Sequence, residues 1–227
     1  MLPRAVLFEL DGVLADTENI HVAAWERTFG AMGLDVPVEE CVRAVGMDDR
    51  VFLAQVFADR KIAAGDAEGW ALRKQRVTAE LLADSPRVDP GAVELALRLR
   101  DRGVGLAVVS TSWKANVVSV IRAAGLADAF PVIVSRDDFS AWHPGDPQGF
   151  RKALRRLKVP YRQAIALVGG SLGYMAAMSA RVKSVVVGNR AQPVGWEPRS
   201  AYLGSLADVD EAVAMLERWA FGLGMGG

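Results

Sequence analysis

Two carboxylates, Glu9 and Asp11, directly follow a short apolar run at the start of the chain, and Gly12 forms a turn after them. Further along, Ser110 ends a second apolar run and His143 lies in a loop. Carboxyl and imidazole groups are the side chains that most often transfer protons in catalysis. An unperturbed histidine titrates near neutral pH, and burial raises the pKa of a carboxyl group. If these groups meet in one pocket, they form a set of proton carriers suited to general acid–base chemistry.

The elements that must position these groups alternate between expected strands and expected helices. Continuous apolar runs are typical of strands covered on both faces, and this order predicts a Rossmann-like α/β fold with a doubly wound parallel sheet. Such sheets bind ligands at the carboxyl ends of their strands, which is where Glu9, Asp11, Ser110 and Ser171 are expected. The expected strands are residues 6–8, 106–110, 132–134, 165–168 and 185–187, and the expected helices are 92–102, 113–124, 148–157 and 172–181.

One stretch breaks this alternation. Residues 16–86 contain helical patterns at 21–32, 49–59 and 67–82 and no clear strand. We interpret the stretch as an all-helical cap domain inserted into an α/β core domain of residues 1–15 and 87–227. The run "DSPRVDPG", rich in turn-forming residues, marks the return of the chain to the core.

The composition limits the classes of partner and of location. The 27 basic and 27 acidic residues balance, so we expect neither nucleic acid nor an anionic membrane surface as a partner. The sequence has no apolar run long enough for a membrane span and no signal-peptide pattern at its start. Cys41 is the only cysteine, so the chain cannot form an internal disulfide. We expect a cytoplasmic protein with a small-molecule ligand, and the sequence does not indicate an oligomeric state.

Several stretches, taken in order, resemble a known family: "LFELDGVLADTE", the helical insert, "AVVSTSWKANV", "HPGDPQGF" and "LVGGSLGYMAAMSA". Residues 4 to about 188 resemble the haloacid dehalogenase superfamily, and within it the phosphoglucomutase-like phosphatases and mutases with a helical cap. The resemblance implies that the first of two aspartates is a nucleophile and magnesium ligand, and that the second exchanges protons with the leaving group. It also implies a hydroxyl group and a lysine that bind phosphate, and an acidic pair that completes the metal site.

The sequence departs from this pattern at most of these positions. Glu9 stands at the position of the nucleophile, His143 at that of the lysine, and Gly169 and Gly170 at those of the acidic pair, whereas Asp11 is retained. Magnesium requires near-octahedral oxygen coordination, and the two glycines remove carboxylate ligands. Loss of the metal and of the lysine removes most of the charge stabilisation that phosphoryl transfer needs. We therefore expect no metal cofactor and the loss of magnesium-dependent phosphatase chemistry.

The candidate catalytic residues are Glu9, Asp11 and His143, and no residue is assigned to a metal. Trp113 and Trp142 are expected near the mouth of the pocket, where aromatic walls favour a ring-shaped or apolar ligand. Each assignment has a structural alternative: Glu9 held only by backbone N–H groups, for example, or Ser110 capping the helix that begins near residue 113. The candidate substrate-binding residues are Gly12, Ser110, Thr111, Trp113, Trp142 and Ser171.

Three functions remain open. The first is metal-independent acid–base chemistry on a small organic metabolite, favoured by the converging proton carriers. The second is a non-catalytic pseudoenzyme that binds a metabolite or a partner protein, favoured by the number of altered positions. The third is residual phosphatase or phosphoglucomutase-like activity on a small phosphorylated metabolite, which the resemblance implies. Whether the chain is an enzyme is therefore an open question at this point.

Overall fold

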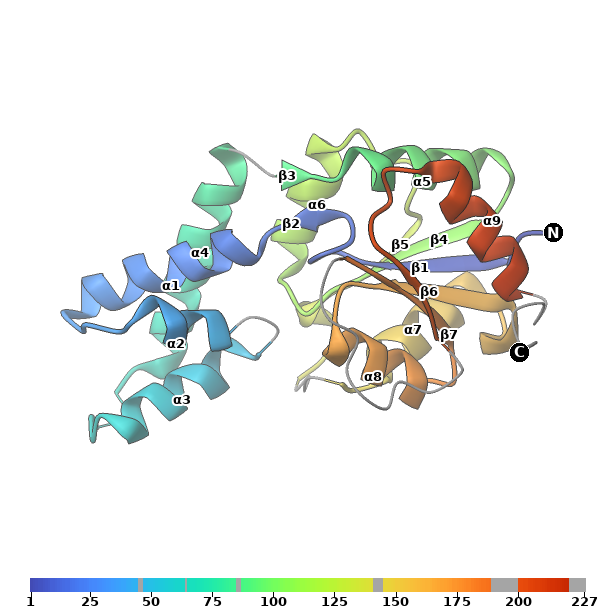
Figure 1. Ribbon diagram of the computed structural model, residues 1–227. Helices are drawn as coiled ribbons and strands as arrows, with labels where there is room; N and C mark the ends of the chain where they lie inside the picture. Colours follow the sequence, from blue (N-terminus) through green and yellow to red (C-terminus); the bar gives the residue numbers. More distant parts are fainter. Residues whose placement is uncertain (45–46, 64, 85–86, 141–144, 189–199, 221–227) are drawn as a thin grey trace. The chain divides into compact units, whose positions relative to one another are not determined.

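The computed structural model describes residues 1–44, 47–63, 65–84, 87–140, 145–188 and 200–220. The chain forms two compact units (Figure 1). The first, here called the core unit, comprises Met1–Asp16 and Arg87–Gly227. The second, the cap unit, comprises Thr17–Pro86.

The core unit is built on a six-stranded sheet with the order β5-β4-β1-β6-β7-β8, in which neighbouring strands are parallel. The predicted parallel sheet is thus confirmed, with β8 as an additional strand. β1 lies between β4 and β6, so residues that follow it lie beside the ends of both neighbours. The strands are β1 (Ala5–Glu9), β4 (Gly105–Val109), β5 (Val132–Val134), β6 (Ala164–Val168), β7 (Lys183–Val187) and β8 (Ser200–Leu203). A separate antiparallel pair joins β2 (Ala15–Asp16) to β3 (Arg87–Val88).

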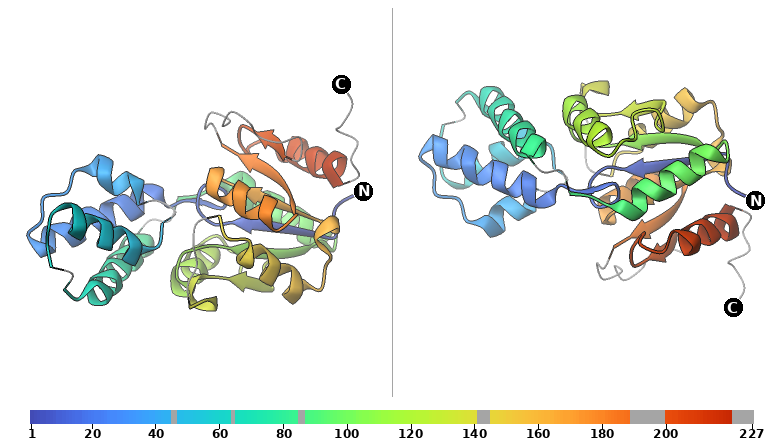
Figure 2. Two further views of the ribbon diagram at one scale, coloured as in Figure 1. Left: turned by 90° about the horizontal axis from the view of Figure 1, so that it is seen from below. Right: turned by 90° about the horizontal axis from the view of Figure 1, so that it is seen from above.

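Helices cover both faces of this sheet (Figure 2). On one face, Leu7 of β1 belongs to the same buried apolar cluster as Phe150 of α7. On the other face, the ring of Phe8 meets Phe130 edge to face, with 5.4 Å between the ring centres. β1 is therefore apolar along its length because both of its faces are buried. The helices of the core unit are α5 (Pro90–Asp101), α6 (Lys114–Ala123), α7 (Gln148–Leu157), α8 (Ser171–Ser179) and α9 (Val209–Ala220).

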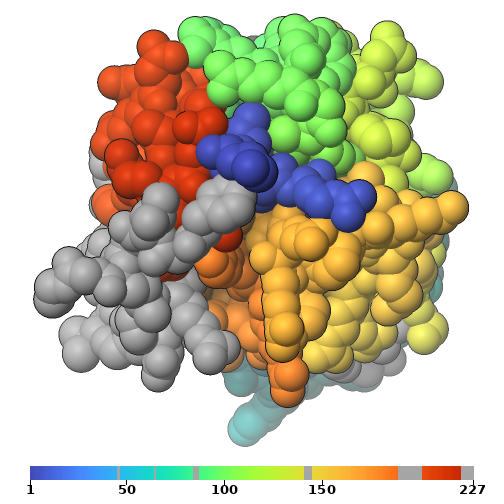
Figure 3. Space-filling view, turned by 90° about the vertical axis from the view of Figure 1, so that its right-hand side faces the viewer, coloured from blue at the N-terminus to red at the C-terminus, as the bar shows by residue number. Residues whose placement is uncertain are grey.

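The chain starts at the amino end of β1. The amino group of Met1 lies 3.8 Å from Glu217 Oε1 in α9, and Arg4 N donates a hydrogen bond to the Gln163 carbonyl at 2.8 Å. Figure 3 shows this face, with the first residues in blue between α5 in green and α9 in red. The start of the chain and the carboxylates after β1 are therefore at opposite ends of the strand.

The cap unit consists of α1 (Glu18–Met32), α2 (Val38–Arg43), α3 (Asp49–Asp59) and α4 (Ala67–Asp84). Its core contains an aromatic cluster in which Trp25 stacks on Phe29 and meets Phe52 edge to face, with ring centres 5.1 and 5.0 Å apart. Asp48 begins α3 by accepting a hydrogen bond from Arg50 N. Within the described ranges, no helix is both long and apolar enough to cross a membrane.

A buried cation lies beside this aromatic cluster. Lys74 is only 2% exposed, and its Nζ lies 2.9 Å from Asp49 Oδ1 and 5.2 Å from the centre of the Trp25 ring. The same ammonium lies 2.9 Å from His21 Nδ1, which must accept the hydrogen bond because lysine can only donate. Burial, and then the charge of Lys74, hold the pKa of His21 well below its usual value of 6.5.

This arrangement predicts that acid destabilises the cap unit. Folding lowers the pKa of His21, so below pH 6.5 the unfolded chain binds a proton at this residue more readily than the folded chain does. The free energy of unfolding is therefore highest above pH 6.5 and falls as pH falls below that value. The loss is at most about 1.4 kcal/mol per pH unit, and His21→Gln should remove it. Urea unfolding of the full chain, followed by the amide resonances of α1 and α4, measures this slope. An equal slope in the variant would show that another group is responsible.

Candidate functional site

The carboxyl ends of β1, β4 and β6 bring the candidate residues together. β1 ends at Glu9, and the chain then turns sharply, with the amides of Leu14 and Ala15 both donating to the Leu10 carbonyl at 3.0 Å. Gly12 adopts a φ of +75°, a backbone conformation that favours glycine. This turn holds Asp11 at the end of the sheet, next to Glu9.

The Glu9 side chain crosses from β1 to the turn between β6 and α8. Gly169 N donates a hydrogen bond of 2.9 Å to Glu9 Oε2, across 160 positions of sequence. The Glu9 carboxyl also lies against Gly173 in the first turn of α8, so closely that a β-carbon at position 173 would collide with both of its oxygens. We call this position, formed by Gly169 N–H and the bare backbone of Gly173, the Glu9 seat. An aspartate is one methylene shorter, so the extra length of Glu9 is what carries the carboxyl into the seat.

The seat changes the protonation of Glu9. The pKa of this carboxyl is raised from 4.5 to about 8, and burial is the largest cause. The hydrogen bond from Gly169 lowers the pKa, and the nearby Asp11 raises it. At pH 7 the protonated form of Glu9 therefore exceeds the ionised form by roughly ten to one. Glu9 is thus a neutral carboxylic acid under physiological conditions.

Asp11 is linked to the end of β4 through Ser110. The Ser110 hydroxyl donates to Asp11 Oδ2 at 3.4 Å and accepts a hydrogen bond from Ser112 N at 3.0 Å. Ser110 is buried and directly follows β4, which ends one residue earlier than predicted. Its hydroxyl does not cap α6, where the backbone amide of Lys114 instead bonds to Asp137 Oδ2. The Ser110 hydroxyl therefore contacts Asp11 and does not cap α6, and its predicted role in binding a substrate stays a prediction.

The two loops of the site approach each other through glycine backbones. A β-carbon on Gly169 would lie 2.7 Å from the carbonyl oxygen of Asp11, and one on Gly12 would lie 3.4 Å from Gly169 Cα. A side chain at position 169 therefore requires the two loops to move apart. The close approach of the two loops therefore explains why position 169 is a glycine. The loss of a carboxylate ligand at this position is a separate consequence.

The remaining candidate residues divide into two groups. Trp113 is half-buried at the residue before α6, and Thr111 and Ser171 are exposed, the latter as the first residue of α8. Trp142 and His143 lie outside the described residues, so their proposed roles remain predictions.

The structure offers few side-chain donors for a metal ion near Glu9 among the described residues. Among the described residues, no group of three or more histidines, cysteines, aspartates and glutamates is placed to hold a metal ion. Glu9 is turned toward an N–H group, and residues 169 and 170 have no side-chain oxygen. Magnesium in proteins usually has one or two carboxylate ligands together with waters and substrate oxygens, so the expected absence of a metal cofactor stays a prediction.

Comparison with known proteins defines the class. The sequence model of the family described as "Haloacid dehalogenase-like hydrolase" matches residues 6–187, and the chain therefore belongs to this family. The chain is 30% identical to the phosphoglycolate phosphatase of Rhodospirillum rubrum, over 94% of this chain and 90% of that protein. It is also 30% identical to the chloroplastic protein SUPPRESSOR OF QUENCHING 1 of Arabidopsis thaliana over 81% of its length, but the match spans only 18% of that relative.

A solved structure supports the same class. The crystal structure of CbbY from Rhodobacter sphaeroides in complex with phosphate superimposes with a TM-score of 0.80. That comparison covers 92% of this chain and 96% of the other, at 27% identity. The predicted family and fold are thereby confirmed, whereas the predicted site residues are not tested by these similarities.

Proposed function

We propose that this haloacid dehalogenase-like protein performs metal-independent acid–base chemistry on a small organic metabolite at the ends of β1, β4 and β6. The observation that carries the proposal is the environment of Glu9, whose pKa of about 8 makes it a neutral acid beside Asp11. A carboxyl group that its environment keeps protonated is suited to the role of a general acid. A cytoplasmic location remains our expectation for this activity.

The roles follow from the contacts of each carboxyl. Glu9 donates a proton to the substrate, and its pKa near the operating pH lets it recover that proton readily. Asp11, oriented by the Ser110 hydroxyl, accepts a proton from the substrate. The seat supports this assignment because it holds the Glu9 carboxyl in one place and keeps it neutral.

The same contacts favour an uncharged substrate over a phosphorylated one. A phosphoryl group at this site meets the Asp11 carboxylate, and the residues near Glu9 offer no set of magnesium ligands to offset that repulsion. Phosphoryl transfer depends on such charge stabilisation more than on any other contribution of the protein. The proposed ligand is therefore a small organic molecule with a carbonyl or hydroxyl oxygen that Glu9 can protonate.

Two other functions each have an observation in their favour. The Glu9 carboxyl accepts a hydrogen bond from the backbone N–H of Gly169, which favours a non-catalytic protein that binds a metabolite or partner. Membership of a family that includes phosphoglycolate phosphatases favours residual phosphatase activity. Both are alternative outcomes of the experiment that follows.

The experiment incubates the full chain with a panel of carbonyl and hydroxy metabolites in D2O and detects deuterium incorporation or conversion by mass spectrometry. We expect a turnover that EDTA leaves unchanged and that Glu9→Gln or Asp11→Asn lowers by at least about a hundredfold, the usual effect of losing a general acid or base. Exposed Glu211→Gln is the matched control and should keep full activity.

Other results would contradict this function. A metabolite that binds tightly but is never converted supports the non-catalytic alternative. Magnesium-dependent release of phosphate from sugar phosphates, lost in Glu9→Ala, supports the phosphatase. In the last case the seat itself must open, because its contacts bury the carboxyl that the metal needs.

A further inference from the structure

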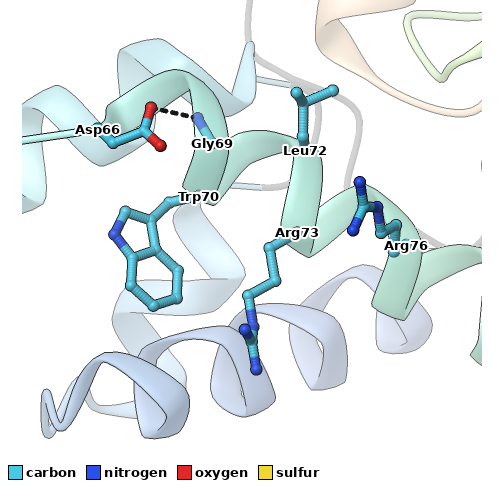
Figure 4. Close-up of a pocket in the computed structure, with 6 residues that line it drawn as sticks. All are labelled: Asp66, Gly69, Trp70, Leu72, Arg73 and Arg76. Carbon is cyan, nitrogen blue, oxygen red and sulfur yellow. Dashed lines mark hydrogen bonds between the residues drawn. The ribbon is translucent and has the colours of Figure 1, made fainter.

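The cap unit has a pocket of about 310 Å³ on the first half of α4 (Figure 4). This volume is at the lower end of the range for sites that bind small molecules, which is roughly 300–1,000 Å³. The pocket is made by one helix segment and the residue before it, and it has no residue in common with the Glu9 site. Its lining residues are Asp66, Gly69, Trp70, Leu72, Arg73 and Arg76.

The amino end of α4 fixes the shape of this pocket. Asp66 precedes the helix, its Oδ1 accepts a hydrogen bond of 2.8 Å from Gly69 N, and its carbonyl accepts one of 3.1 Å from Trp70 N. A β-carbon at position 69 would collide with the Asp66 carboxyl. Gly69 therefore leaves room for the Asp66 carboxyl at the amino end of α4, and a larger residue at position 69 would displace that carboxyl.

The apolar part of the pocket comes from two side chains. Trp70 is half-buried and packs against the aromatic core of the cap unit, so its ring is held in a fixed position. Leu72 is 41% exposed, a large fraction for a leucine side chain. Figure 4 shows Leu72 and Trp70 on opposite sides of the helix, so the rigid indole alone offers the surface on which a flat ring of a ligand can pack.

Two arginines provide the charge. Arg73 and Arg76 are exposed, and neither is paired with a carboxylate among the described residues. In contrast, Arg60 of the same unit is bonded through both of its terminal nitrogens to Glu40. The guanidinium carbon of Arg73 lies 5.6 Å from the centre of the Trp70 ring, so one cation is already positioned next to the apolar surface. The side chains at positions 70, 73 and 76 recur every three residues, which places neighbours of this series on one side of the helix.

We propose that this pocket binds a small organic oxyanion whose flat ring packs on Trp70 and whose charged group is held by Arg73 and Arg76. Guanidinium groups bind carboxylate and phosphate-like oxygens with directed pairs of hydrogen bonds. Asp66 lies at the opposite end of the pocket from Arg76 in Figure 4, which disfavours a second negative charge there. The ligand class is thus a ring with one anionic group, either a carboxylate or a phosphonate-type group.

The test uses the full chain labelled with ¹⁵N and titrated with phenylphosphonate, benzoate, inorganic phosphate and benzyl alcohol. The indole N–H resonance of Trp70, identified by its loss in Trp70→Phe, reports binding at this pocket. We expect saturable shifts with phenylphosphonate, benzoate or both, and the tighter of the two identifies the charged group. Arg73→Gln and Arg76→Gln should each weaken binding at least tenfold, whereas the exposed Arg122→Gln of α6 should not.

Three results would overturn the proposal. They are equal binding of inorganic phosphate or benzyl alcohol, unchanged affinity in both arginine variants, and absence of a saturable shift at Trp70. The other indole resonances of each variant confirm that it is folded. Glu9→Gln should bind these probes as the parent chain does, so this test is independent of the function proposed for the Glu9 site.

Discussion

Replacing Glu9 by glutamine is expected to stabilise the protein progressively as pH rises from 5 to 8. Below pH 4.5 Glu9 is protonated in both the folded and the unfolded chain, so its titration makes no difference to stability. Above that pH the unfolded chain ionises while the folded chain keeps its proton up to about pH 8, so stability is lost as pH rises through this interval. At about 1.4 kcal/mol per pKa unit, the loss is on the order of 5 kcal/mol.

Glutamine has the size of protonated glutamate, and its amide oxygen can accept the hydrogen bond from Gly169 N–H, but it does not titrate. Urea unfolding of both proteins between pH 4 and pH 9 should give curves that meet in acid and separate above pH 5. Glu211→Gln, at an exposed position of α9, is the control and should follow the parent chain. Parallel curves for parent and Glu9→Gln would show that Glu9 titrates normally and that the seat does not raise its pKa.

Gly173→Ala is expected to force the Glu9 carboxyl out of its seat. The added β-carbon collides with both carboxyl oxygens, and the side chain is the part that can move. Moving it leaves the Gly169 N–H group without its carboxyl partner, so below pH 4.5, where Glu9 is mostly protonated in the folded and unfolded chain, we expect a loss of about 1–3 kcal/mol in the free energy of unfolding. The displaced carboxyl should also regain a lower pKa, because burial is the largest cause of its present value.

Length and charge can be separated by a second substitution. Glu9→Asp shortens the side chain, so in combination with Gly173→Ala it should recover much of the loss, and the two changes should be strongly non-additive. Glu9→Gln keeps the length and should give no recovery with Gly173→Ala. Equal losses in both double variants would show that the collision is not what destabilises Gly173→Ala.

The local part of the site was predictable from sequence because it depends on short-range patterns. A strand buried on both faces is a continuous apolar run, and a turn with glycine at positive φ follows it, so the positions of Glu9 and Asp11 at a strand end could be inferred. The order of strands and helices predicted the parallel sheet for the same reason. The helices α2 and α9 and the strand β8 were not predicted. The helix α2 has only six residues, too few for a clear helical pattern. The helix α9 has twelve residues and buries Val209, Val213 and Leu216 at helical spacing, so its pattern was present in the sequence and was missed.

The partner of Glu9 was not predictable in this way. Gly169 is 160 positions away, and its contact depends on how the ends of β1 and β6 meet in three dimensions. From sequence, the two glycines at 169 and 170 indicated the loss of metal ligands but no contact with Glu9. The fold adds that a β-carbon at 169 would lie 2.7 Å from the Asp11 carbonyl, and that Gly173 leaves room for a longer acid at position 9.

The most direct test of this account is the titration of the Glu9 carboxyl itself, by ¹³C NMR of side-chain-labelled glutamate with assignment by loss of the signal in Glu9→Gln. We predict a midpoint near pH 8, with the carboxyl protonated at pH 7. A midpoint near the ordinary glutamate value of 4.5 would contradict the account, because Glu9 would then be an ionised carboxylate at neutral pH, able to bind a metal ion.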